Sequence, residues 1–450
     1  MTQKTSEQAT IFALSSAPGR AGVAVVRISG PNAGMALNVM TPKRPKPRAA
    51  GGRKILHPTT GEVLDRGIVL WFPGPRSFTG EDAAELHLHG SIAVVRAVLS
   101  ALALLPGYRP AEPGEFARRA FLNGKLDLTQ AEGLADLIDA ETEAQRRQAL
   151  AQAQGALSAL YGSWRQTLIE AAALVEASID FTDEADVASD AFAQGRTLVV
   201  ELARQIRRHL EDNHRGEILR SGFRVVLAGP PNVGKSSLLN ALARRDAAIV
   251  SEEAGTTRDV IEVRLDLGGL PVIVSDTAGI RETTASVEME GIRRSMARAE
   301  EADLVIWLTD IHAPEPALPK ALRAMADRTL LVVNKTDLAP DAGQPVLPDD
   351  MIAISVHTGA GLDLLSKRLE QIAAERIAPR EAPALTQERH RRLLEQALED
   401  LSSFLSGDPN QTELRAEDLR RVAMALGKIT GRIDVEEVLD HVFGRFCIGK

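Results

Sequence analysis

A single cysteine, Cys447, is the only thiol in a chain of 450 residues. This scarcity excludes an intramolecular disulfide and a zinc site built from clustered cysteines. No stretch approaches the roughly 18 uninterrupted apolar residues of a membrane-spanning helix, and the N-terminal MTQKTSEQATIFALSS lacks the apolar segment of a signal peptide. We therefore expect a soluble protein of the cytoplasm.

Positive charge is also scarce, because 53 lysines and arginines face 61 aspartates and glutamates, a net charge of −8. The protein as a whole lacks the basic balance of a general nucleic-acid coat, so any contact with RNA must be local. One local candidate is Thr41–Arg48 (TPKRPKPR), a proline-broken segment with four basic residues. It is either a loop that contacts phosphate or a solvated connection.

Aromatic residues make up only 4% of the chain, whereas alanine is abundant, which favours helices over extensive β-structure. Residues 1–122 hold short strand-like runs between turns, which is typical of an α+β domain. Residues 123–219 and 380–450 have helical periodicity, and residues 220–379 alternate strands and helices. Helices on both sides of the α/β part predict a multidomain protein in which an α/β domain is inserted into a helical domain.

The strongest motif follows the strand-like Phe223–Ala228. Gly229-Pro-Pro-Asn-Val-Gly-Lys-Ser236 is a complete GxxxxGKS, and the helix-like Ser237–Leu242 comes next. In such a P-loop, backbone N–H groups surround the phosphates at a helix N-terminus, the lysine reaches the β and γ oxygens, and the serine hydroxyl binds Mg²⁺. We assign these last two roles to Lys235 and Ser236.

Two later segments supply the switch elements of a GTPase. Val272–Ser275 is strand-like and leads into Asp276-Thr-Ala-Gly279, where the carboxylate can hold the Mg²⁺ shell and the glycine can follow the γ-phosphate. Gly255-Thr-Thr-Arg-Asp259 offers a threonine that completes the metal shell when γ-phosphate is present.

Guanine specificity is indicated by Asn334-Lys-Thr-Asp337, which follows the strand-like Leu330–Val333. The Asp337 carboxylate can accept two hydrogen bonds from guanine N1 and N2, a donor pair that adenine lacks. Ser355-Val-His357 stands at the fifth motif of G proteins, where His357 replaces the usual lysine, a change that a backbone contact with the base would tolerate. The motifs together predict a Ras-like P-loop G domain.

Two departures from a Ras-like site concern hydrolysis. Ile280 stands where a glutamine would orient the attacking water, so another group must do so. Asn232, in the P-loop, is either a plain loop residue or the ligand of a monovalent cation near the β/γ bridge, where an arginine finger would otherwise supply positive charge.

At this point the sequence resembles a family, the tRNA modification GTPases called MnmE or TrmE. The P-loop and Gly255–Asp259 would also suit ribosome-assembly GTPases. More specific are PGEFARRAFLNGKLDLTQAE at 113–132, IDFTDE at 179–184 and the terminal FCIGK, which look like signatures of this family. The likeness runs from about Ile11 to Lys450.

The resemblance implies an N-terminal domain that binds folate and dimerises the protein, a helical domain, and an inserted G domain. It implies Mg²⁺- and K⁺-dependent GTP hydrolysis in a homodimer. With the FAD-containing partner MnmG, this hydrolysis serves to install the (carboxymethyl)aminomethyl group at C5 of the wobble uridine, U34, of certain tRNAs. The implied one-carbon donor is 5-formyl- or 5,10-methylenetetrahydrofolate, and no membrane is involved.

The resemblance also assigns roles by position. Glu288 matches the water-orienting glutamate and so fills the gap left by Ile280, while Asn232 and Lys235 share the catalytic role. Mg²⁺ falls to Ser236 and Thr257, and K⁺ to Asn232, Ser251, Glu253 and Thr256. The complete GTP site comprises Asn232, Val233, Gly234, Lys235, Ser236, Ser237, Ser251, Glu252, Glu253, Ala254, Gly255, Thr256, Thr257, Asp276, Thr277, Ala278, Gly279, Asn334, Lys335, Thr336, Asp337, Ser355, Val356 and His357.

Four residues match the family's folate positions: Arg27, Glu85, Lys125 and Lys450. Basic groups and one carboxylate suit the carboxylate tail and the pterin edge of a folate. Glu81 is a close alternative to Glu85. The family usually continues His-Gly-Gly where Ser91 follows Gly90 here, which puts a close backbone approach at that point in question.

Two alternatives stay open in the sequence. Cys447 is either a nucleophile that adds to C6 of a uridine or a structural residue near the substrate, and no base can be assigned to it. The whole protein is either a modification enzyme or a regulatory GTPase switch that binds RNA or a ribosomal particle. The N-terminal part, which resembles a folate-binding domain, discriminates between them, because a pure switch needs no one-carbon donor.

Overall fold

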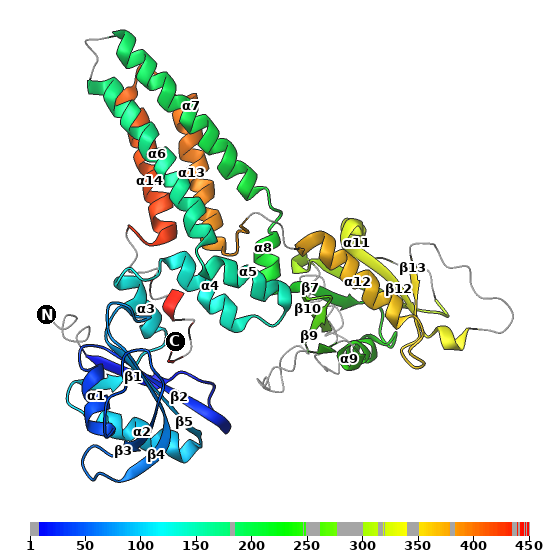
Figure 1. The fold of residues 1–450 in the computed structure, drawn as a ribbon. Helices are drawn as coiled ribbons and strands as arrows, with labels where there is room; N and C mark the ends of the chain where they lie inside the picture. Colours follow the sequence, from blue (N-terminus) through cyan, green and yellow to red (C-terminus); the bar gives the residue numbers. More distant parts are fainter. Residues whose placement is uncertain are drawn as a thin grey trace, which may run out of the picture. The chain divides into compact units, whose positions relative to one another are not determined.

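The computed structural model describes residues 9–180, 185–245, 247–248, 262–276, 300–313, 318, 320–339, 351–378, 383–433, 439, 442–444, 446, 448 and 449. The chain divides into two compact units, whose elements are labelled in Figure 1. The first takes the residues up to Ala135, 152–173 and those from Ala416 onward, and the second takes 136–151 and 174–415. Among the described helices, none combines the length and apolar character needed to cross a membrane.

The first unit contains a six-stranded sheet in the order β3-β4-β5-β2-β1-β6. Its neighbours are antiparallel except for β1 and β6. The strands are β1 (Thr10–Leu14), β2 (Ala21–Ser29), β3 (Gly51–Leu56), β4 (Val63–Phe72), β5 (Ala83–Gly90) and β6 (Tyr108–Pro110).

One face of this sheet lies in the core and the other carries polar side chains. Along β2, the buried Val26 and Ile28 alternate with Val25 and Arg27, which are half-buried, as expected of an antiparallel sheet with one covered face. Helices α1 (Ala33–Met40) and α2 (Ile92–Ala103) contribute their apolar side chains to the same core. The expected α+β N-terminal domain is thus confirmed.

The described end of the chain returns to this unit. Phe443 and Phe446 join a buried cluster with Ala117 and Leu128, and a β-bridge connects Pro113 with Ile448. Besides α1 and α2, the first unit contains α3 (Glu115–Leu122) and most of α4 (Leu128–Asp139), α6 (Ala156–Asp180) and α14 (Thr412–Thr430). The C-terminal residues therefore belong to the structure of the N-terminal part.

The second unit is built on a seven-stranded sheet in the order β13-β12-β11-β7-β10-β9-β8. Strands β13, β12, β11, β7 and β10 are parallel, and β9 and β8 continue the sheet in antiparallel fashion. The strands are β7 (Phe223–Ala228), β8 (Ala247–Ala248), β9 (Glu262–Leu267), β10 (Leu270–Asp276), β11 (Leu304–Asp310), β12 (Thr329–Asn334) and β13 (Met351–Ala353).

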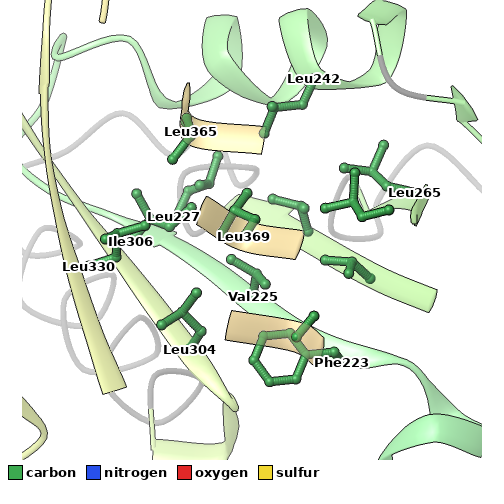
Figure 2. Close-up of a cluster of buried hydrophobic side chains, with 14 of the residues drawn as sticks. Phe223, Val225, Leu227, Leu242, Leu265, Leu304, Ile306, Leu330, Leu365 and Leu369 are labelled. Carbon is green, nitrogen blue, oxygen red and sulfur yellow. The ribbon is translucent and has the colours of Figure 1, made fainter. Parts of the chain in front are cut away.

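The core of this α/β domain explains the apolar runs of its strands. Every residue of β7 except Arg224 is buried, because parallel strands are covered by helices on both faces. Figure 2 shows Phe223, Val225 and Leu227 in one buried cluster with Leu365 and Leu369 of α12. The helices of the domain are α9 (Lys235–Arg245), α11 (Lys320–Arg323) and α12 (Leu362–Ile377), with 3₁₀ turns at Ala326–Arg328 and Thr336–Leu338.

The points where the chain enters and leaves this domain lie side by side. Arg391, nearly buried, pairs with Asp212 at 2.6 Å and with Glu217 at 3.1 Å. A Cβ added to Gly216 would come within 2.3 Å of the Leu385 carbonyl oxygen. The surrounding helices are α5 (Glu143–Ala153), α7 (Ala185–Leu210), α8 (Arg215–Ser221) and α13 (Glu388–Ser406). The expected insertion of the α/β domain into helical sequence is therefore confirmed.

Candidate functional site

The polar ends of four parallel strands meet at one edge of the second sheet. In the strand register, Asp276 lies opposite Leu227 near the end of β7, and Asp310 lies opposite Asn334. Ligands of open α/β sheets bind at the carboxyl ends of such strands. The segments that the sequence assigns to phosphate, metal and base therefore converge on one place.

The P-loop between β7 and α9 requires glycine at two positions. Gly229 has φ +145°, and a Cβ there would lie 2.2 Å from the Leu308 carbonyl oxygen. Gly234 has φ +101°, and a Cβ there would lie 2.5 Å from Asn334 Nδ2. Asn232 has φ +61°, a left-handed conformation that asparagine tolerates better than most residues. The left-handed backbone conformation thus explains why asparagine suits position 232, independently of any role in binding a cation.

Lys235 and Ser236 occupy the first turn of α9. Lys235 Nζ donates to the carbonyls of Gly229 and Pro230 at 2.9 and 2.8 Å, so its ammonium lies across the loop. Burial lowers the pKa of Lys235, while the Asp276 carboxylate acts in the opposite direction. Ser236 Oγ donates to Asp276 Oδ2 at 2.5 Å. A hydroxyl and a carboxylate at this spacing are the hard oxygen donors that Mg²⁺ prefers, so these residues fit the metal.

Asn334 connects the phosphate loop to the base-binding loops. Its Nδ2 donates to the Val233 carbonyl at 2.8 Å, and its Oδ1 accepts from the Val356 N–H at 3.1 Å. Ser355 Oγ donates to Asp337 Oδ1 at 2.5 Å, and this hydrogen bond holds the pKa of Asp337 below its ordinary value. Asp337 is therefore an ionised acceptor, the form that guanine recognition needs.

His357 and the ion pair between Lys335 and Asp310 lie beside the base site. The His357 side chain is 87% exposed and lies 3.8 Å from Asp337. Lys335, at φ +66°, pairs with Asp310 at 2.6 Å. Burial acts to raise the pKa of Asp310, but the Lys335 hydrogen bond and charge leave it below the ordinary value. Sequence reasoning missed Asp310, although its place at the end of the strand-like Leu304–Asp310 was a usable signal.

Several predicted residues lie outside the described parts of the chain. They are Ser251, Glu252, Glu253, Ala254, Gly255, Thr256, Thr257, Thr277, Ala278, Gly279, Ile280, Glu288, Cys447 and Lys450. Within the described ranges, no group of three or more histidine, cysteine, aspartate or glutamate side chains could hold a metal ion. The described nucleotide site therefore consists of the P-loop, Asp276 and the base loops.

Two of the four folate positions face each other on the polar side of the first sheet. Arg27 of β2 and Glu85 of β5 are cross-strand partners and form an ion pair at 3.1 Å. His87 Nε2 lies 3.2 Å from the other Glu85 oxygen. The Arg27 guanidinium lies 5.6 Å from the ring centre of Phe78 and 5.8 Å from that of Phe116. This arrangement brings a carboxylate, a cation and the exposed ring of Phe78 together, whereas Phe116 is buried.

The remaining folate positions approach this sheet to different degrees. Lys125 is exposed, and its Cγ would lie 3.3 Å from a Cβ added to Gly80. Lys450 is not described, but the preceding Gly449 accepts a hydrogen bond from Ser15 Oγ at 2.7 Å through its carbonyl. A Cβ at Gly90 would meet the Ala21 carbonyl at 2.2 Å, so close backbone approach occurs there, whereas Ser91 has an ordinary φ of −85°.

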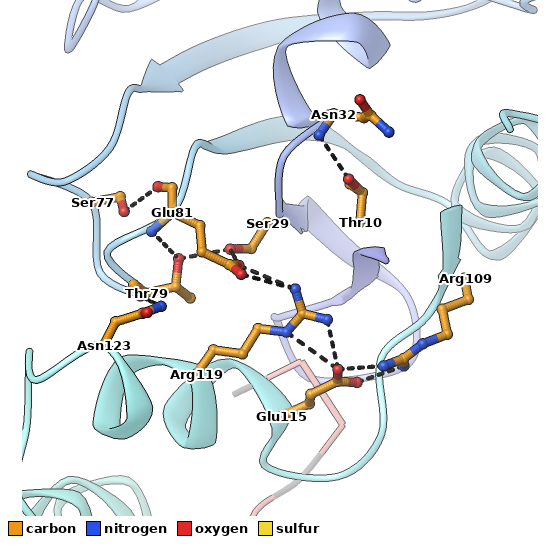
Figure 3. Close-up of polar contacts among 10 residues, drawn as sticks. All are labelled: Thr10, Ser29, Asn32, Ser77, Thr79, Glu81, Arg109, Glu115, Arg119 and Asn123. Carbon is orange, nitrogen blue, oxygen red and sulfur yellow. Dashed lines mark hydrogen bonds and ion pairs between the residues drawn. The ribbon is translucent and has the colours of Figure 1, made fainter. Parts of the chain in front are cut away.

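A buried polar network, shown in Figure 3, includes Glu81, whereas Glu85 pairs with Arg27 outside it. Arg119, 7% exposed, pairs with Glu81 at 3.1 Å and with Glu115 at 2.8 Å. Glu115 also pairs with Arg109 at 2.6 Å, and Glu81 Oε2 accepts from Ser29 Oγ at 2.7 Å. Glu81 is thus held by internal partners, whereas Glu85 lies beside Arg27. Sequence reasoning did not identify this network.

Comparison with known proteins covers almost the whole chain. Residues 10–125 match the family described as GTP-binding protein TrmE N-terminus, and residues 128–447 match the MnmE helical domain. A relative from Maricaulis maris named tRNA modification GTPase MnmE is 52% identical over 442 residues, 98% of this chain and 99% of that protein. One of the same name from Paramagnetospirillum magneticum is 53% identical over 450 residues, with 98% and 99% covered. Among solved structures, the FeoB G domain of Methanococcus jannaschii covers 34% of this chain and 97% of its own at 28% identity, with a TM-score of 0.26.

Proposed function

The chain belongs to the MnmE (TrmE) family of tRNA modification GTPases, and we propose that it acts as a K⁺-activated GTPase in the modification of wobble uridines. In this proposal, a cytoplasmic homodimer works with the FAD-containing MnmG to install the (carboxymethyl)aminomethyl group at C5 of U34. A tetrahydrofolate, in the 5-formyl or 5,10-methylene form, supplies the one-carbon unit.

The observation that carries the GTPase part is the connection made by Asn334. One side chain joins the carbonyl of Val233 in the P-loop to the N–H of Val356 in the base loop. The Asn334 side chain therefore fixes the spacing between the phosphate and guanine sites, which lowers the ordering cost of binding. An ionised Asp337 beside this connection supports guanine over adenine.

The described residues suggest how hydrolysis is supported. Lys235, now bound to two loop carbonyls, would exchange them for β and γ oxygens of GTP and stabilise the charge of the transition state. Ser236 and Asp276 would hold Mg²⁺, with Thr257 as a further ligand, and Mg²⁺ would neutralise phosphate charge. For K⁺ we propose Asn232, Ser251, Glu253 and Thr256, with Glu288 orienting the attacking water.

We place the folate site on the face of the first sheet that carries Arg27 and Glu85. Arg27, Glu85, Lys125 and Lys450 would bind the donor, with the Glu85 carboxylate toward the pterin edge and the cations toward the carboxylate tail. The corresponding division of the chain is 1–122 for folate binding and dimerisation, 123–219 with 380–450 for the helical domain, and 220–379 for the G domain.

The ion dependence gives a direct prediction. Replacing Na⁺ by K⁺ at constant ionic strength should raise the turnover of GTP, because Na⁺ is too small for a site whose ligands are spaced for K⁺. The measurement is phosphate release by the full chain in chloride salts of the two ions. Equal rates in the two salts would remove the ion from the mechanism.

The substitution Asp337→Asn should change the nucleotide preference of the protein from GTP to xanthosine triphosphate. The amide can donate to the C2 oxygen of xanthine, which the carboxylate would repel, and each hydrogen bond to a charged group is worth roughly 1.5–3 kcal/mol. Binding of fluorescent GTP and xanthosine triphosphate analogues tests this, with Asp327→Asn, an exposed aspartate of the same domain, as the matched control. An unchanged preference for guanine would mean that Asn334–Asp337 is not the base site.

The modification itself is tested in cells that lack this gene. Mass spectrometry of tRNA nucleosides should show loss of the modified wobble uridine, restored by the wild-type gene. Variants of Arg27 or Glu85 should fail to restore it while GTP hydrolysis by the purified chain stays unchanged. If the modified wobble uridine stays at its wild-type level while the ribosomes are defective, the protein is instead a regulatory switch.

A further inference from the structure

The net charge of the chain conceals a strong asymmetry between its parts. Residues 9–125 contain 15 lysines and arginines but only seven aspartates and glutamates, a charge of +8 in a chain whose total is −8. The rest of the protein therefore carries −16. Such asymmetry is typical of a protein in which one part meets a polyanion.

Eight of these cations gather at one edge of the first sheet. They lie in the loop before β3, in the β3–β4 hairpin and in the loop after β4. We call them the basic edge: Lys43, Arg44, Lys46, Arg48, Arg53, Lys54, Arg66 and Arg76. Strand β3 is the outermost strand of the sheet, so these side chains lie along the edge of the sheet that β3 forms.

Three of the five arginines of the basic edge are held in place by contacts that leave some of their N–H donors available to another partner. Arg44 lies 4.8 Å from the ring centre of Trp71 and donates to the Gly34 carbonyl at 2.8 Å. Arg48 lies 5.7 Å from that of Phe72, and Arg53 Nε donates to the Lys43 carbonyl at 3.0 Å. A guanidinium has five N–H donors, so each positioned arginine can still bind an anion with little further ordering cost.

Within the described residues, these charges are not used for ion pairs of the protein itself. In the described part of the chain, none of the eight pairs with a carboxylate, and the nearby Asp65 is bound to His89 at 2.8 Å. Lys54 and Arg66 lie directly opposite each other on neighbouring strands, where like charges are destabilising. Edge lysines discourage strand pairing between copies, which accounts for Lys54 but not for the cations outside β3.

We propose that the basic edge binds the phosphate backbone of tRNA. Five of its eight cations are arginines, whose planar guanidinium matches phosphate in a bidentate manner. An anionic membrane fits less well, because residues 41–54 (TPKRPKPRAAGGRK) contain no Leu, Ile, Phe or Trp side chain that could enter the acyl layer. A second copy facing this edge would oppose like charge with like charge.

The test is binding of fluorescently labelled tRNA to the full chain over a range of KCl concentrations. Replacing Lys43, Lys46 and Lys54 by glutamine should raise Kd about tenfold or more near 0.1 M salt and lower the slope of log K against log salt by about two to three. The matched control replaces Lys367, Arg368 and Arg392, which are equally exposed, and should bind as the wild type does. Since all six side chains are on the surface, GTP hydrolysis should not change and thermal stability should not fall, because loss of the Lys54–Arg66 repulsion acts only to raise it.

Three outcomes would overturn the proposal. An unchanged Kd and slope in the Lys43, Lys46 and Lys54 variant would place tRNA elsewhere, and so would equal losses in the control. Loss of binding to phosphatidylglycerol vesicles with intact tRNA binding would assign the edge to a membrane. The inference rests on the tRNA part of the proposed function alone. Failure of K⁺ stimulation with variant-sensitive tRNA binding would sink the ion dependence and leave the basic edge standing.

Discussion

Replacing Glu288 by alanine is expected to lower kcat for GTP hydrolysis by about 10²-fold or more, with Kd for GTP within about a factor of three. Hydrolysis needs a water held in line with the leaving oxygen, and Ile280 has no hydrogen-bonding group with which to hold it. A carboxylate that reaches the water directly or through a second water would act on the chemical step and not on nucleotide binding.

Single-turnover hydrolysis and equilibrium binding of a GTP analogue separate the two effects. The matched control is Glu301→Ala, which removes an exposed acid of the same domain and should leave both quantities unchanged. Near-normal kcat in the Glu288 variant would remove this residue from the mechanism. If the variant hydrolyses GTP slowly yet supports full tRNA modification in cells, then GTP binding and not hydrolysis is what the modification requires.

Replacing Glu115 by alanine is expected to destabilise the first unit by up to about 3–5 kcal/mol, because it removes one of the two carboxylates that pair with the buried Arg119 guanidinium. Arg119 is 7% exposed and would keep only Glu81, while Arg109 would lose its carboxylate (Figure 3). Hydrogen exchange of the β1, β2 and β5 amides, read by mass spectrometry, reports the stability of this unit separately from the second.

Glu143→Ala is a matched control for the buried pair. Glu143 also pairs with two arginines, Arg146 and Arg147, at 2.7 and 2.6 Å, but on the surface, where solvent screens the interaction. Glu143 belongs to the second unit, so its variant is read by hydrogen exchange of the α5 amides and of the second sheet, where no measurable change is expected. Equal effects of the two substitutions would show that burial does not decide the strength of these ion pairs.

The pH dependence of the Glu115 contribution has a definite sign. Burial opposes ionisation, but hydrogen bonds from Arg109, Arg119 and the Glu112 N–H leave the pKa of Glu115 below its ordinary value of 4.5. A depressed pKa contributes stability above the unfolded-state pKa, and this contribution is lost as pH falls through the folded-state pKa. The stability difference between wild type and Glu115→Gln should therefore be constant above pH 5, roughly, and shrink below it.

Much of the nucleotide site was predictable because its chemistry depends on contiguous residues. A P-loop needs glycines, a lysine and a serine at set offsets between a strand and a helix, and Gly229–Ser236 meets that need within eight positions. The buried strand β7 and the base loop at Asn334–Asp337 follow the same logic. Change of periodicity along the chain likewise indicated the inserted α/β domain, since helices and strands differ in the spacing of their apolar residues.

Pairings between distant segments were decided by the tertiary structure alone. Sequence spacing could not separate Glu81 from Glu85, because both follow Gly80 closely. The fold turns Glu81 toward Arg119 and sets Glu85 opposite Arg27 in the neighbouring strand.

The same reason applies to the ion pair of Asp310 with Lys335 and to the basic edge. Asp310 and Lys335 are brought together by the register of β11 and β12. Four cations of the basic edge stand together in Thr41–Arg48, but only the pairing of β3 with β4 adds Arg53, Lys54 and Arg66 to them. Local spacing thus determined which residues could bind phosphate and guanine, whereas the alignment of separate strands decided which charges are paired inside the protein and which face outward.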